Sequence, residues 1–280
     1  MVTAHAGAAT AISRRASLPM YNLPEMRPAN AAFWNAIRSE LRRQGAEDLA
    51  VDLEFEQRPV PAAIAPDMLF TQVCGYPLQT IFRGQAVVLG APVYAVAHCA
   101  GPTHTGVFIV HRDAPYRQLE DLKGSRFVFN SRHSNSGMNL PRRMIAEIAG
   151  GGAFFGSIAE THSQPGNIER VARGEADATC VDCVTYAFFR RHRPKLGELT
   201  RILAATLSTP SIPFVTAVTT PDDVRARLRT ALFSVGRSAE WSDVRAGLLL
   251  HDIVAVEMSS YAGQLQHERE AAALGYPELR

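Results

Sequence analysis

The sequence is poor in cysteine, and it has neither a long apolar run nor an excess of charge of one sign. Its 280 residues include four cysteines, which are too few and too scattered for a disulfide framework. No segment reaches the roughly 20 consecutive apolar residues of a membrane span, so we expect no membrane insertion. The 29 basic and 27 acidic side chains leave a net charge of +2, which argues against a nucleic-acid-binding surface.

Sequence motifs of common enzyme and metal sites are also missing. The chain lacks a GxSxG elbow, an HExxH pair, a Walker loop and a GxGxxG turn after a strand. Cys180 and Cys183 have CxxC spacing, but no second ligand pair accompanies them. This pattern indicates two half-buried thiols at a strand end, since a disulfide across so short a span would be strained. We therefore expect no catalytic residue, no metal and no cofactor.

The N-terminal segment shows no export signal. Residues 1–23 are rich in alanine and lack an apolar stretch preceded by basic residues. The protein is then either cytoplasmic or represented by a chain that starts after its export signal. We expect residues 1–16 to form a loose tail.

Strand-like and helical patterns alternate along the rest of the chain. The 46% of apolar residues provides for a substantial core, and the length fits one large or two medium domains. The predicted strands are 16–21, 49–55, 67–70, 86–97, 104–111, 126–130, 177–181, 202–206 and 214–219. The predicted helices are 28–43, 117–124, 137–149, 167–173, 182–192 and most of the chain from 222 onward. This alternation predicts an α/β fold with mostly parallel pairing.

The order of these elements predicts two lobes. Residues 104–197 form a self-contained set of βα units, and we expect them to be lobe 2. Residues 17–103 and 198–280 would together form a discontinuous lobe 1. A cleft with a hinge would lie between the lobes, and such clefts are preferred ligand sites.

The strongest local signal is the run from Phe129 to Pro141, in which a strand ends, hydroxyl residues follow and a helix begins. The first turn of a helix has free N–H groups and a partial positive charge. Ser134 and Ser136 add donors, and Gly137 permits close approach of a ligand to the backbone. These features are typical of an anion site. Ordinary capping of the helix by either serine is the alternative.

Further polar groups follow other predicted strands. His162 lies in a polar cluster before a helix and is suited either to donate to a ligand oxygen or to face solvent. Asp182 ends a strand where α/β sheets place ligand groups, although it could equally cap the next helix. Tyr21 and the turn Thr71–Tyr76 also follow strands, and a tyrosine at a cleft mouth can cover a ligand and offer its hydroxyl, although Tyr21 could equally pack in the protein. The basic run 190–195 follows a predicted helix, where it complements the helix dipole and is solvated.

Several of these segments resemble the phosphate, phosphite and phosphonate-binding proteins of ABC importers, the PhnD-like family. Residues 119–130 are similar to the family's LxDLKGKxFAF approach to its site, and Ser134–Gly137 matches its Ser-x-Ser-Gly turn. Residues 168–177 resemble its ixaVaxGxaD segment, and residues 206–215 resemble its sPxiPxxp return crossing. The resemblance extends from about Tyr21 to Val235.

The resemblance implies a type II periplasmic-binding-protein fold, with a ligand cleft between two mixed-sheet lobes. It implies a monomeric, periplasmic solute-binding protein that captures a phosphonate, phosphate or phosphate ester for an ABC permease. The implied ligand-binding residues are Ser134, Asn135, Ser136, Gly137, His162, Asp182, Tyr21, Thr71, Gln72 and Tyr76. Two alternatives use the same fold in the cytoplasm. One is a lyase-type enzyme with Asp182 or His162 as acid or base, and the other is a ligand sensor.

Overall fold

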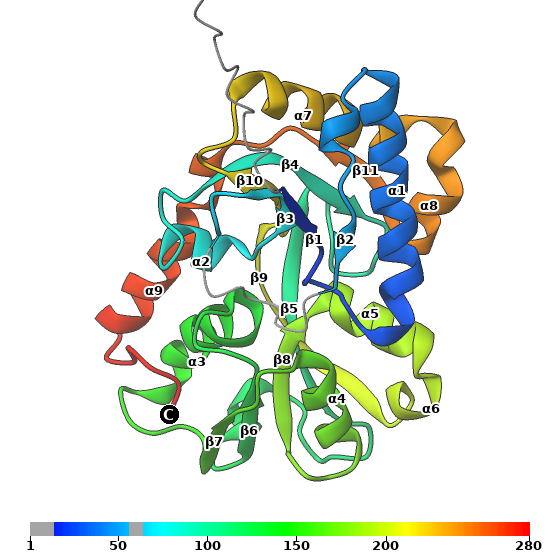
Figure 1. The fold of residues 1–280 in the computed structure, drawn as a ribbon. Helices are drawn as coiled ribbons and strands as arrows, with labels where there is room; N and C mark the ends of the chain where they lie inside the picture. The colour runs from blue at the N-terminus through cyan, green and yellow to red at the C-terminus, as the bar shows by residue number, and fades with distance from the viewer. Residues whose placement is uncertain (1–13, 56–63) are drawn as a thin grey trace, which may run out of the picture.

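The computed structural model describes residues 14–55 and 64–280, which form two mixed β-sheets covered by helices (Figure 1). The predicted α/β class is confirmed. Residues 1–13 of the predicted N-terminal tail lie outside the described residues, and β1 begins at Arg15. None of the described helices is both long and apolar enough to cross a membrane.

The first sheet has the strand order β11-β4-β10-β3-β1-β2. Its strands are β1 (Arg15–Ser17), β2 (Leu53–Glu54), β3 (Met68–Gln72), β4 (Ala86–Tyr94), β10 (Phe214–Ala217) and β11 (Leu250–Val254). Strand β1 runs parallel to β2 and β3, whereas β10 and β11 pair antiparallel with β4. The predicted parallel pairing therefore holds for only part of the sheet.

Helices α1 (Arg27–Arg43), α7 (Asp222–Arg237) and α8 (Ser242–Gly247) accompany the first sheet (Figure 1). Helix α1 matches its prediction because apolar residues recur at helical spacing: Phe33, Trp34, Ile37 and Leu41 are all at most 1% exposed. Gly45 ends the helical segment with a positive φ of 68°, a conformation that glycine adopts without strain.

The second sheet has the strand order β7-β6-β8-β5-β9. Its strands are β5 (Thr103–His111), β6 (Arg126–Phe129), β7 (Ser157–Glu160), β8 (Ala178–Asp182) and β9 (Thr200–Pro210). Its helical segments are η4 (Asn135–Asn139), α3 (Leu140–Ala149), α4 (Gln164–Ala172), α5 (Cys183–His192) and α6 (Pro194–Gly197). The segment η4 is a single π-helical turn, a feature that often occurs at functional sites.

Two chain segments connect the sheets. Residues 95–102 lead from β4 to β5, and residues 211–213 lead back from β9 to β10. The long strands β5 and β9 pair antiparallel from Thr103↔Pro210 to His111↔Thr200. This two-stranded unit extends from the crossings into the second sheet (Figure 1).

The C-terminal part contacts the second sheet as well. Helix α9 (Gly263–Ala273) packs on α3, and Tyr276 is fully buried in the core of the second sheet. Strand β9 and this C-terminal segment were both expected in lobe 1, because sequence order does not show on which body a returning segment packs. The lobe boundaries themselves stay a prediction.

Several elements differ from the sequence prediction: the strand predicted at 49–55 is reduced to β2, and the helix predicted at 117–124 is a short 3-10 helix at Leu119–Leu122. Strand β11 occurs in a region predicted to be mainly helical, and β7 was not predicted at all. Strand β7 is a sheet edge whose residues are mostly exposed, so it lacks the apolar signal of a buried strand. Helix α4 begins at Gln164, three residues before its predicted start, because Ser163 caps it.

Candidate functional site

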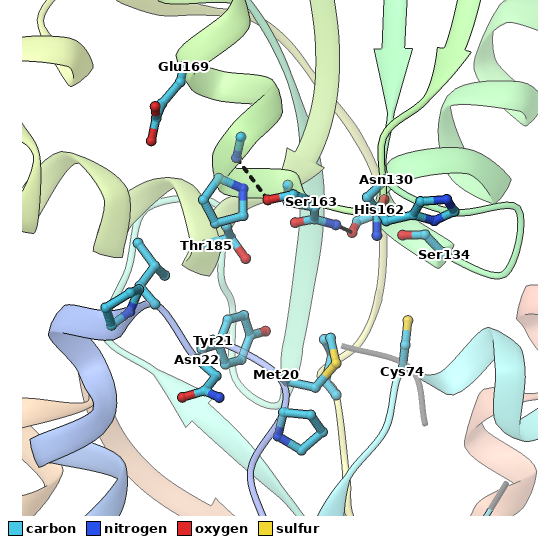
Figure 2. A pocket seen from close by; sticks show the side chains of 18 of the residues that line it. Met20, Tyr21, Asn22, Cys74, Asn130, Ser134, His162, Ser163, Glu169 and Thr185 are labelled. Carbon is cyan, nitrogen blue, oxygen red and sulfur yellow. Dashed lines mark hydrogen bonds between the residues drawn. The ribbon is translucent and has the colours of Figure 1, made fainter. Parts of the chain in front are cut away.

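A cavity of about 320 Å³ is lined by residues from the connections of both sheets (Figure 2). This volume is typical of sites for small molecules. One wall comes from the first sheet and its crossings: Pro19, Met20, Tyr21, Asn22, Leu23, Pro24, Cys74 and Ile212. The other comes from the second: Asn130, Ser134, Ser136, His162, Ser163, Gln164, Pro165, Gly166, Glu169, Thr185 and Arg193.

Serine hydroxyls at two helix starts line the second wall. Ser134 caps η4 and accepts a hydrogen bond from the main-chain N–H of Gly137, with an N···O distance of 3.0 Å. Ser163 caps α4 in the same way, accepting from the N–H of Gly166 at 3.0 Å. Each hydroxyl that accepts a protein hydrogen bond keeps its own O–H, which is free to donate to another group. Both helix N-termini also contribute positive electrostatic potential.

Ser136 completes this set of donors from the first turn of η4. Its Oγ accepts a hydrogen bond from the side-chain amide of Gln164 at 3.1 Å, and the Gln164 carbonyl accepts from the main-chain N–H of Asp182 at 2.9 Å. The Gln164 amide therefore connects η4, α4 and the end of β8. Each of the three serine hydroxyls already accepts a hydrogen bond from the protein, so its hydrogen is left to donate to a ligand. This arrangement suits an oxyanion better than a cation.

Asn130 follows β6, lines the cavity and is 5% exposed. A Cβ atom placed on Gly137 would lie 2.0 Å from Asn130 Oδ1 and 3.0 Å from Ser134 Oγ, both closer than van der Waals contact allows. Glycine at position 137 is thus required for the Asn130 side chain to lie across η4. Gly137 does not line the cavity, so it shapes the site through its neighbours.

Asp182 lies behind the cavity and does not line it. Its Oδ1 accepts from the N–H groups of Val184 and Thr185, which confirms that it caps α5. Its Oδ2 accepts from the hydroxyl of Tyr21 at 3.1 Å and lies 2.6 Å from His104 Nδ1. Both of its oxygens are therefore occupied by protein groups.

Burial and charge set the protonation of this network. Burial lowers the pKa of His104, but the adjacent Asp182 carboxylate raises it by more, so the pKa lies above its ordinary value. Burial, followed by the charge of Asp182, raises the pKa of Tyr21, which keeps its hydroxyl protonated as a donor. Tyr21 belongs to the first wall and Asp182 to β8, so this buried hydrogen bond joins the two bodies.

Asn135 is fully buried, and its side chain makes hydrogen bonds to other protein groups. Its amide nitrogen donates to Thr209 Oγ1 on β9 at 3.1 Å, and its carbonyl accepts from Asn139 at 3.1 Å. Asn135 therefore holds η4 against the return crossing, and it does not line the cavity.

The turn after β3 was predicted to supply ligand contacts, and the residues named there lie outside the cavity lining. Thr71 shares a hydrogen bond with Ser17, and Gln72 donates to the main-chain oxygen of Ile212. Tyr76 packs in the core of the second sheet. The Cys74 side chain from the same turn lines the cavity in their place (Figure 2).

The positive charge of Arg193 is already balanced by carboxylates of the protein. Its guanidinium donates to the carboxylates of Glu25 and Glu169 and lies over the ring of Phe189. His162 also borders the cavity, but its side chain is 80% exposed. The groups that remain to receive an anion are therefore mainly neutral donors.

Several lining residues were not predicted from the sequence, although a local pattern marks at least one of them. Ser163 stands three residues before Gly166, the spacing between an N-cap and the main-chain N–H that donates to it, so a capping pattern could have found it. Arg193 was expected only as part of a basic run at a helix end; it does stand at the C-terminus of α5, and its partly exposed side chain also lines the cavity. Met20, Asn22 and Glu169 carry no local pattern that indicates a site.

The ion pair between Arg193 of the second wall and Glu25, which directly follows Pro24 of the first wall, holds the two sides of the cavity together. Replacing Glu25 with glutamine is expected to lower the free energy of unfolding near neutral pH by about 0.5–1 kcal/mol, since both side chains are partly exposed. The hydrogen bond from Arg193 lowers the pKa of Glu25, so this stabilisation is present above the ordinary pKa and disappears as the pH falls through the lowered one. Urea denaturation at several pH values measures it.

A matched control is Glu47→Gln. Glu47 pairs with Arg42 at 3.4 Å, is 74% exposed and joins segments of one body only. Its replacement should change stability by less than about 0.5 kcal/mol at every pH. Equal effects of the two substitutions would contradict a specific role of Glu25 between the walls.

Comparisons with solved structures show the same fold at low sequence identity. A binding-protein component of a phosphonate ABC transporter from Pseudomonas aeruginosa superposes with a TM-score of 0.73 at 16% identity, covering 93% of this chain and 87% of that one. PhnD1 from Prochlorococcus marinus, in complex with methylphosphonate, gives 0.71 at 15% identity and covers 93% and 99%. A Xanthomonas citri protein bound to ATP gives 0.66 at 15%, covering 94% and 98%. The predicted type II periplasmic-binding-protein fold is confirmed.

Comparison of the sequence with family models identifies the family of the chain, whereas the solved structures show its fold. No curated protein matches the chain. A family model described as the periplasmic substrate-binding protein of phosphonate ABC transporters matches residues 82–261, which is more than half of the chain. This match includes the serine turn of η4, the cap of α4 and the return crossing through β9. The chain therefore belongs to the family of periplasmic substrate-binding proteins of phosphonate ABC transporters.

Proposed function

We propose that this protein captures a small phosphonate, or a closely related phosphate-type oxyanion, and delivers it to an ABC permease. The observation that carries the proposal is the convergence of Ser134, Ser136 and Ser163 on one cavity. Each hydroxyl accepts a hydrogen bond from the protein and keeps a hydrogen for the ligand. Two helix N-termini stand behind these donors.

The oxygens of the bound anion would accept hydrogen bonds mainly from neutral donor groups. Arg193 does not offer an uncompensated positive charge, because Glu25 and Glu169 share it. Recognition by fixed hydroxyl and N–H donors reads the tetrahedral shape of the oxyanion as well as its charge. The first wall, with Tyr21 and Met20, would then cover the ligand and exclude water (Figure 2). We expect the protein to act in the periplasm, as the family description indicates, and to act as a monomer.

The alternative of an enzyme on this fold finds little support in the geometry. Asp182 is 1% exposed, and its two oxygens cap a helix and contact Tyr21 and His104. A general acid or base must reach the proton that it transfers. His162 is exposed at the cavity rim. Binding without chemical change is the function that this arrangement favours.

Calorimetric titration with methylphosphonate, phosphate and sulfate tests the proposal. We expect methylphosphonate or phosphate to bind, and Ser136→Ala to weaken that binding by about 10-fold or more, because a hydrogen bond to a charged group is lost. Ser136 is suited to this test because it is not a helix cap. Ser134→Ala should weaken binding similarly and also lower stability by about 1 kcal/mol.

The matched control is Ser39→Ala on the surface of α1, where the hydroxyl bonds to the main-chain oxygen of Asn35. This variant should bind as the unmodified protein does. Absence of binding by every anion in the panel would contradict the proposal. Binding that survives both Ser134→Ala and Ser136→Ala unchanged would contradict the assigned site.

A further inference from the structure

Two cysteines that are distant in the sequence lie in contact at the first crossing between the sheets. The Sγ atoms of Cys99 and Cys183 are 3.5 Å apart, although 84 residues separate them. Cys99 belongs to the segment 95–102 that leads from β4 to β5, and Cys183 is the first residue of α5. All four cysteines are free thiols.

The CxxC spacing of Cys180 and Cys183 does not reflect a pair. Cys180 is fully buried in the core of the second sheet, whereas Cys183 belongs to the other large core cluster. Both are buried rather than half-buried, which corrects the expectation from the sequence. Cys183 therefore faces the crossing segment and not its neighbour in the motif.

The surroundings of Cys99 hold its thiol in position and leave it accessible. The Cys99 N–H donates to the main-chain oxygen of Val96 at 3.1 Å, and His98 in this turn has a positive φ of 68°. A turn with a non-glycine residue in this conformation is held by its context. The Cys99 side chain is partly exposed, and Cys183 borders a separate cavity of about 300 Å³ beside this turn.

We propose that Cys99 and Cys183 are a redox modification site, at which a small or protein disulfide oxidant converts the two thiols into an intramolecular disulfide. The Cys99 thiolate attacks the oxidant and forms a mixed disulfide, releasing one thiol. Cys183 then loses its proton and attacks Cys99 Sγ, which releases the second thiol. The protein loses two hydrogens, and the oxidant's disulfide is reduced to two thiols.

The order of attack follows from the greater exposure of Cys99 and from the raised pKa of Cys183. The hydrogen bond with Cys99, followed by burial, raises the pKa of Cys183, so Cys183 loses its proton less readily than an ordinary thiol. The oxidant needs to reach only Cys99, which is the more exposed of the two. Closing the bond requires the sulfurs to approach from 3.5 Å to about 2 Å, a shift within reach of an exposed turn.

The disulfide would connect the crossing segment to lobe 2 beside the Asp182 network. The closed ring would contain strands β5 to β8, which form most of the second sheet. A ring of this size removes much conformational freedom from the unfolded chain. We therefore expect oxidation to raise the midpoint of thermal unfolding by roughly 5–15 °C.

The test oxidises the purified full chain with excess glutathione disulfide and maps its cysteines by non-reducing peptide mass spectrometry. We expect two of the four thiols to disappear and a peptide linking Cys99 to Cys183 to form. Thermal unfolding should shift upward and return to its original midpoint after reduction. The variant C99S should show neither the linked peptide nor the shift.

C180A is the matched control, because it removes the other half of the CxxC motif and leaves the proposed pair intact. It should still form the Cys99–Cys183 bond and show the reversible shift. Four free thiols after oxidation, a bond between Cys180 and Cys183, or an oxidised form that unfolds no later than the reduced form would each overturn the proposal. These readouts need no ligand and are independent of the proposed function.

Discussion

Replacing Asp182 with asparagine is expected to lower the free energy of unfolding by about 2–4 kcal/mol, although the substitution changes little in volume. Asparagine can still cap α5, so the cap alone does not account for the effect. The loss arises at Oδ2, which accepts from Tyr21 and lies 2.6 Å from His104. His104 would be left at 1% exposure without the carboxylate that balances its charge.

The destabilisation caused by Asp182→Asn should decrease as the pH rises. The pKa of His104 in the folded protein lies above its ordinary value of 6.5. A group with a raised folded pKa contributes stability that is present below its unfolded pKa and is lost as the pH rises through the folded pKa. The destabilisation by Asp182→Asn should therefore be larger at about pH 6 than at about pH 9. Urea denaturation at both values measures the difference.

Asp177→Asn is the matched control, since Asp177 also accepts a main-chain N–H and pairs with a cation, Arg126, but is 26% exposed. Its effect should stay below about 1 kcal/mol. A double-mutant cycle with His104→Gln isolates the pair itself. Additive effects of His104→Gln and Asp182→Asn would contradict the coupling, because contacting charged groups should not behave independently.

The fold was predictable from the sequence where a residue's own neighbours decide its structure. The buried face of α1 is set by apolar residues at helical spacing, and the serine turn before α3 follows from the end of a strand beside hydroxyl residues. The strand β7 was not predictable, because its exposed residues pair with β6 through the backbone. Backbone pairing leaves no side-chain pattern in the sequence.

The candidate site was predictable in part, because Tyr21, His162 and the two serines Ser134 and Ser136 were named from the sequence and all line the cavity. Ser134 and Ser136 line the cavity as expected, whereas Asn135 between them faces Thr209 on β9. The helical rotation along η4 directs neighbouring side chains to different sides, so a continuous run of candidates cannot all reach one ligand. Contacts across the two bodies, such as Cys99 with Cys183, depend on the tertiary fold and have no local signal.

Substituting alanine for Gly137 is expected to abolish most ligand binding while leaving the fold intact. The added Cβ would lie 2.0 Å from Asn130 Oδ1, so the buried Asn130 side chain has to move. That movement displaces one lining residue and disturbs the Ser134 cap. We expect affinity for methylphosphonate to fall about 100-fold, because Asn130 and Ser134, which would both donate to the anion under the proposed function, are displaced. Stability should fall by about 1–3 kcal/mol from overpacking.

Gly263→Ala is the matched control, since a Cβ at that position, at the start of α9, meets nothing within 4 Å. It should bind normally and change stability by less than about 1 kcal/mol, in the favourable direction if any. A second variant separates the clash from the loss of donors. Adding Asn130→Ala to Gly137→Ala should restore stability, because the clashing atom is gone, but not binding. Recovery of binding in that double variant would show that Asn130 only blocks the site and does not serve the ligand.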